Sequence, residues 1–195
     1  MAYTTAALLK TYLGATGSGD DALLTALIAR AQSAIDHYTG RTFEASGDTT
    51  RKFTVGVDTD GNMLYFDEDC AAITTVTTNA DDGSGGITIA AAYYATHPRN
   101  RTPYYAIEIL NTYSWEYTTD AENGITVAGK WAFSTTAPDD IVQACTRWAA
   151  YFYRQKDAGV FDTTAIPDAG IIQVPQGIPK DVRDLLDKYP KGFGG

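Results

Sequence analysis

The sequence predicts an α+β fold in which a helical bundle is interrupted by an antiparallel β domain and followed by an extended C-terminal tail. Three observations support this prediction. Amphipathic helix patterns occupy the N-terminal region and return near residue 140, and short alternating segments with turn signals fill the region between them. A Pro- and Gly-rich stretch then ends in a short amphipathic segment. Short strands with close turns are typical of an antiparallel sheet or small barrel, not of a parallel βαβ sheet.

These patterns divide the chain into four parts. The first is an N-terminal helix pair, the second a β-rich insert, the third a long helix that completes the bundle, and the fourth an extended tail with a short docking helix. Their expected ranges are residues 1–43, 44–134, 135–158 and 159–195.

Two helices are expected in the first part. The first covers residues 6–13, with Thr4 or Thr5 as its N-cap and Gly14 as its end. The second begins within residues 18–21 and ends at Gly40, because apolar residues recur between them at helical spacing.

The long helix of the third part has a clear start. Pro138 gives up an amide that would have no helical partner at a first position, and Asp139 and Asp140 suit the positive end of the helix dipole. Its apolar residues recur at spacings of four, three and four. We expect this stripe to pack on the second helix, in a bundle core made of Leu24, Leu27, Ile28, Ile35, Ile141, Cys145, Trp148 and Phe152.

Turn signals organise the β-rich insert into pairs of strands. The Asp60-Gly61 pair predicts a hairpin turn because both central positions of such a turn favour positive φ. The loops at residues 81–86 and 97–103 separate two further pairs, and another strand precedes the long helix. The expected strands are residues 52–59, 62–66, 73–78, 87–90, 93–96, 104–110 and 125–133.

Composition and charge bound the function. The chain has 195 residues, 44% of them apolar, which is enough for one good core or two small ones. It has 24 acidic and 15 basic residues and a net charge of −9, which argues against binding nucleic acid by phosphate neutralisation, though not against a protein that DNA passes. Arg99 and Arg101 form one local basic cluster, a candidate contact for DNA or an acidic partner; the alternative is a solvated hairpin tip.

No catalytic, cofactor or metal site is expected. Asp58, Asp60 and Asn62 resemble the opening of a calcium loop, but the required spacing to a terminal Glu is missing. His37 and His97 belong to no nucleophile or metal pattern. We therefore expect a protein that is not an enzyme.

The cysteines and the apolar stretches indicate in which cellular compartment the protein is expected. Cys70 and Cys145 suit two buried small hydrophobes, although the sequence alone leaves a disulfide open. No stretch approaches the roughly 20 apolar residues of a membrane span, and the N-terminus lacks a signal pattern. The simplest expectation is a cytosolic protein without a membrane partner.

The order of these parts resembles the head-tail connector (adaptor) proteins of tailed bacteriophages. The resemblance covers both helical ends, the strand-helix junction and the closing segment, whereas residues 44–123 match no pattern of that family. The segments that carry it are residues 8–13, 20–24, 31–35, 38–43, 127–133, 137–141, 144–154 and 178–186.

The resemblance implies a structural role in the virion. Such adaptors form a ring, usually of twelve copies, that docks under the portal protein, extends the DNA channel and offers a platform to the tail or stopper. It also implies assembly in the host cytoplasm and a genome that passes without specific binding. In related adaptors the C-terminal part engages the portal, a role that the resemblance carries to Ile178, Pro179, Val182, Leu185, Leu186 and Tyr189.

Two alternatives stay open from the sequence. One is another ring-forming component of a phage tail. The other is a small β-rich module that binds a carbohydrate or a peptide in a groove lined by Tyr93, Tyr94, Tyr104 and Tyr105.

Overall fold

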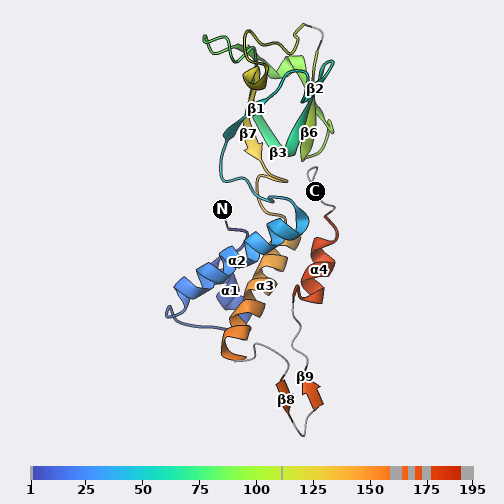
Figure 1. The fold of residues 1–195 in the computed structure, drawn as a ribbon. Helices are drawn as coiled ribbons and strands as arrows, with labels where there is room; N and C mark the ends of the chain where they lie inside the picture. Colours follow the sequence, from blue (N-terminus) through green and yellow to red (C-terminus); the bar gives the residue numbers. More distant parts are fainter. Residues whose placement is uncertain (1, 111, 159–163, 167–169, 173–176, 190–195) are drawn as a thin grey trace. The chain divides into compact units, whose positions relative to one another are not determined.

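The computed structural model describes residues 2–110, 112–158, 164–166, 170–172 and 177–189. These residues form the α+β fold that the sequence predicts (Figure 1). They divide into two compact units: a helical unit of residues 2–39 and 137–190, and a β unit that contains residues 40–136. The helices are α1 (Ala6–Leu13), α2 (Asp21–Thr39), α3 (Asp139–Ala158) and α4 (Lys180–Leu186), with short 3₁₀ turns η1 (Ala91–Tyr93) and η2 (Ala121–Asn123).

The β unit is built on an open antiparallel sheet. Five of its seven strands follow the order β1-β7-β3-β6-β5, and β2 and β4 each pair with β3. Strands β8 and β9 form a separate two-stranded sheet. The strands are β1 (Thr49–Phe53), β2 (Thr59–Asp60), β3 (Met63–Thr78), β4 (Ile87–Ile89), β5 (Tyr94–His97), β6 (Tyr104–Ile109), β7 (Ile125–Trp131), β8 (Thr164–Ile166) and β9 (Gly170–Ile172).

Helix α1 has the ends that its sequence predicts. The side chain of Thr5 accepts a hydrogen bond from the backbone N–H of Leu8, so Thr5 rather than Thr4 is the N-cap. Gly14 takes the left-handed conformation, with φ of 67°, and its N–H bonds back to carbonyls of the last turn. Thr4 instead shares a hydrogen bond of 2.7 Å with the hydroxyl of Thr146 on α3.

The helical unit buries one face of α3 against α2. Helix α3 begins at Asp139, and Pro138 precedes it, accepting hydrogen bonds from the N–H groups of Ile141 and Val142. The cap position therefore lies one residue later than the sequence suggests. The buried side chains here include Leu24, Ile28, Ile35, Ile141, Cys145 and Trp148, while Leu27 and Phe152 keep partial exposure.

Helix α4 is part of the helical unit. It packs on α3, and its Val182 and Leu186 side chains are fully buried. Parts of the expected tail, residues 159–163, 167–169 and 173–176, lie outside the described residues.

The largest difference from the predicted strands concerns β3. Residues 62–66 and 73–78 were expected as two strands, but they belong to a single strand with shifts in register against both β6 and β7. The acidic residues 67–69 in its middle suggest a loop in the sequence. Arginines at other positions pair with these carboxylates, which lets the strand continue through them.

The first predicted hairpin is also shifted. Residues 52–59 do not form one strand, because Asp58 closes a turn in which its carboxylate accepts a hydrogen bond of 2.7 Å from the N–H of Thr54. Asp60 pairs with Met63, so the two-residue loop is residues 61–62 and only its glycine, Gly61 with φ of 57°, takes positive φ. The hairpins at residues 81–86 and 97–103 join β3 to β4 and β5 to β6, as expected.

The core of the β unit draws on distant strands. Three aromatic side chains, Phe53, Phe66 and Trp131, come from β1, β3 and β7 and pack with ring centroids 5.0 to 5.8 Å apart. Aliphatic side chains complete it, among them Leu64, Val76, Ile107, Ile109, Ile125 and Val127. In the part of the chain that the structure describes, no helix is long and apolar enough to cross a membrane.

Candidate interaction surfaces

The six residues expected to dock on a portal fall into two groups. Val182 and Leu186 are fully buried in the helical unit, where they hold α4 in place. The other four are partly exposed: Ile178, Pro179, Leu185 and Tyr189. Leu185 lies in α4 and the other three flank its ends. These four residues, here called the α4 outer face, are the part of the predicted site that a partner can reach without unpacking the helix.

Polar contacts also hold α4 in the helical unit. The Tyr38 hydroxyl of α2 donates a hydrogen bond of 2.6 Å to Asp187, which raises the pKa of Tyr38. Asp181 meets Arg147 of α3 at 2.9 Å. Because these contacts are exposed, each contributes little on its own, and the buried apolar side chains contribute most of the docking energy of α4.

An apolar hollow lies between α1 and α3. Its volume is about 290 Å³, and Leu8 and Tyr12 at its rim are about half exposed. The remaining lining comes from Thr11, Val142, Gln143, Thr146 and Arg147. Apolar side chains exposed together in this way are typical of surfaces that contact other proteins.

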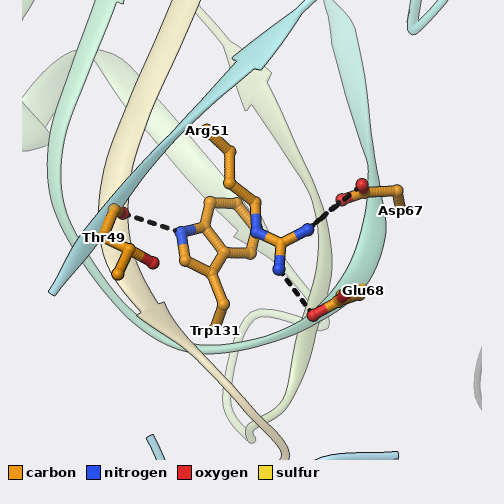
Figure 2. Close-up of polar contacts among 5 residues, drawn as sticks. All are labelled: Thr49, Arg51, Asp67, Glu68 and Trp131. Carbon is orange, nitrogen blue, oxygen red and sulfur yellow. Dashed lines mark hydrogen bonds and ion pairs between the residues drawn. The ribbon is translucent and has the colours of Figure 1, made fainter. Parts of the chain in front are cut away.

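In the β unit, Arg51 links three strands (Figure 2). Its guanidinium lies 4.9 Å from the ring centroid of Trp131, and it pairs with Asp67 at 3.1 Å and Glu68 at 2.6 Å. The indole N–H of Trp131 donates a hydrogen bond of 2.9 Å to the carbonyl of Thr49. These contacts make Arg51 a structural residue rather than a free cation.

The predicted basic cluster lies on the loop between β5 and β6. Arg99 and Arg101 are both exposed there. At the base of the loop, His97 and Glu108 lie 3.1 Å apart across the β5–β6 pair. Two exposed cations thus lie two residues apart in a chain whose net charge is −9.

The structure brings together two of the four tyrosines expected to line a groove. Tyr94 and Tyr104 line an open hollow of about 550 Å³ in the β unit. Tyr93 instead packs edge-on against Tyr113, with ring centroids 5.3 Å apart, and Tyr105 lies 37% exposed outside the hollow. Arg99 and Asn100 also line this hollow, and the sequence does not reveal this because it depends on how β5 lies relative to β3.

Reactive groups are scarce among the described residues. No group of three or more His, Cys, Asp or Glu side chains within them is placed to hold a metal ion. Cys70 and Cys145 are both buried and free, and burial raises the pKa of each thiol to about 12. Such thiols stay protonated at neutral pH and are poor nucleophiles.

Comparison with protein families assigns the chain. A model described as head completion protein matches residues 2–191 and therefore covers both units. The chain belongs to the head completion protein family. This match confirms the resemblance to phage head-tail connectors that the sequence predicts, whereas no curated protein matches the chain significantly.

Two solved structures share the fold of this chain. One is a chain in the neck of an empty GTA particle computed with C6 symmetry, and it is 18% identical with a TM-score of 0.57. The other is a chain in the neck of a native GTA particle computed with C12 symmetry, with the same identity and TM-score. Both matches cover 95% of this chain, and they cover 88% and 87% of the respective neck chains.

Proposed function

We propose that this protein is a structural head-tail connector whose copies form a ring beneath the portal of the capsid. The observation that carries the proposal is the family match over residues 2–191, which spans both units rather than a single shared helix pair. The two neck chains with the same fold support it, since they belong to particles solved with C6 and C12 symmetry. The role is one of assembly, not of catalysis.

The charge of the chain suits a channel through which a genome passes. A net charge of −9 per copy makes a ring that repels phosphates rather than binding them, so DNA can slide without being retained. Such a ring, which we place at twelve copies, would sit at the head-tail interface of the virion after assembly in the host cytoplasm, and would offer its far side to a tail or stopper protein.

The α4 outer face is the proposed contact with the portal protein. Its four residues, Ile178, Pro179, Leu185 and Tyr189, keep partial exposure while Val182 and Leu186 stabilise the helix beneath them. A helix that presents apolar side chains on a preformed support loses little conformational freedom on binding. The buried pair thus positions the docking residues.

Native mass spectrometry and negative-stain electron microscopy of the purified protein, alone and mixed with its portal, test this proposal. We expect a ring of about twelve copies, or a ring that forms on the portal. A protein that stays monomeric and never associates with the portal would overturn the connector role and favour a separate ligand-binding module.

A double variant, Leu185→Asp with Tyr189→Ser, tests the docking surface. We expect it to fold and to lose portal binding, because a carboxylate would have to be desolvated at the contact. The matched control is Lys180→Ser, a change on the same helix at an exposed position outside the apolar set. Portal binding by the double variant at wild-type strength would show that docking uses another surface.

A further inference from the structure

The central strand β3 has a gap on one of its sides. On this side, β6 pairs with β3 up to Cys70, and β4 pairs with β3 from Val76 onward. Between these two paired stretches lie residues 71–75. They have β7 on the opposite side of β3, but on the side of β6 and β4 no strand of the described residues pairs with them. The backbone groups of residues 71–75 that are not bonded to β7 are therefore open to a further strand on this side, whereas the Ala72 carbonyl already accepts a hydrogen bond of 3.4 Å from the Cys70 thiol.

The open hollow of the β unit adjoins this gap. It is about 550 Å³ in volume and is lined both by β3 and by β5, which is the end strand of the sheet order. Small side chains make up much of the lining, with tyrosines and polar groups beside them. The residues are Ala71, Ala72, Ile73, Ala91, Tyr94, Ala95, Thr96, Arg99, Asn100 and Tyr104.

The charge of the hollow selects the kind of ligand. Arg99 lines it and Arg101 follows two residues later in the same exposed loop, whereas no acidic residue contributes to the lining. In a chain of net charge −9 this is a local positive site. Exposed arginines favour carboxylates, to which the guanidinium can donate two parallel hydrogen bonds.

We propose that this hollow binds an extended, acidic peptide segment of a partner protein by strand addition to residues 71–75 of β3. Main-chain hydrogen bonds to the strand edge hold the peptide, and the pocket beside the edge selects its side chains. An apolar side chain of the peptide lies between Tyr94 and Tyr104, and a carboxylate meets Arg99 and Arg101. The site lies within the β unit and does not depend on the ring or on the α4 outer face.

A display library of random peptides, selected against the purified full-length protein at low salt, tests the proposal. We expect enrichment of peptides that alternate β-branched or aromatic residues with polar ones and carry Asp or Glu at one end. Enrichment of basic peptides, no enrichment at all, or binding of glycans on an array in place of peptides would overturn it.

Two variants locate the binding of the selected peptides. Arg99→Glu with Arg101→Glu should weaken their Kd by about tenfold, because two exposed ion pairs are lost. Ala95→Trp fills the hollow and should abolish binding, with circular dichroism and thermal melting showing that the variant still folds. The matched control is Arg154→Glu, a charge reversal at an exposed position of α3 in the helical unit, which should leave the Kd unchanged.

Hydrogen-deuterium exchange separates strand addition from simple charge attraction. With a selected peptide bound, those amides of residues 71–75 that are not bonded to β7 should exchange more slowly, since they gain a hydrogen-bonded partner. Peptides that bind the Ala95→Trp variant as well as the wild type, or that leave exchange at residues 71–75 unchanged, would refute the site.

Discussion

The helical unit and the β unit form their cores from residues that are spaced differently in the sequence. In the helical unit, the side chains that α3 buries are three or four residues apart in the sequence, as in Ile141, Cys145 and Trp148. In the β unit, side chains that touch come from distant strands, such as Phe53 and Trp131. The comparison teaches that local periodicity identifies the first kind of core, whereas the second depends on strand pairing.

The two units also differ in how they place charge. The Arg41–Asp69 ion pair of the β unit is almost buried, with side-chain exposures of 8% and 5%. The Arg147–Asp181 pair of the helical unit is 32% and 53% exposed. A buried pair is costly to break because one uncompensated charge remains, so loss of one partner should cost more at Arg41–Asp69 than at Arg147–Asp181.

The largest effect is expected for Trp148→Ala in the helical unit. Trp148 is 5% exposed and stacks on Phe152 with ring centroids 6.0 Å apart. Removal of this indole should lower the free energy of unfolding by about 3–5 kcal/mol, measured by chemical denaturation. The control is Leu23→Ala, at a 36% exposed position of α2, which should cost far less. A loss below about 1 kcal/mol at Trp148 would mean that it serves a surface between subunits rather than the core.

A smaller effect is expected for Gly129→Ala in the β unit. A Cβ at Gly129 would overlap the carbonyl oxygen of Ala72 and lie 3.3 Å from the Cα of Ile73, so β3 and β7 would have to separate locally. We expect a loss of about 1–3 kcal/mol in the free energy of unfolding. Gly47→Ala is the matched control, because a Cβ there meets open space. Equal stability of the two variants would show that the β3–β7 contact adapts easily.

The smallest effect concerns the acid stability of the β unit. Backbone N–H groups of Thr118, Thr119 and Asp120 bond to Asp81 and lower its pKa from 3.8 to about 2. The carboxylate therefore stabilises the fold fully above pH 3.8, and this contribution is lost as the pH falls towards about 2. Asp81→Asn should flatten the pH dependence of the melting temperature between these values, and an unchanged profile would contradict this role.

The sequence predicts the helical unit closely because its signals are local. The Thr5 cap, the glycine that ends α1 and the stripe on α3 all depend on residues within a few positions of one another. Most strands of the β unit are also recognisable from alternation and turns. The hairpin at Gly61 is shifted by one residue, because its register depends on which residues pair and not on the turn sequence alone.

The candidate surfaces divide in the same way. The residues of the α4 outer face can be selected from the sequence as apolar positions in and around a short amphipathic helix, but only packing shows that Val182 and Leu186 are buried. The hollow in the β unit could not be predicted, since it depends on Arg99 and Tyr94 lying beside residues of β3 that are distant in the chain.

By itself, the sequence determined the α+β class, the order of helices and strands, and the resemblance to head-tail connectors that the family match confirms. These depend on periodicity, caps and turn residues, which act over short distances along the chain. Only the tertiary structure decided that residues 67–69 continue one long strand and that Arg99 lines a hollow beside residues 71–73 of β3. Such features depend on contacts between charges and backbone groups that are distant in the sequence, and local sequence patterns do not predict those contacts.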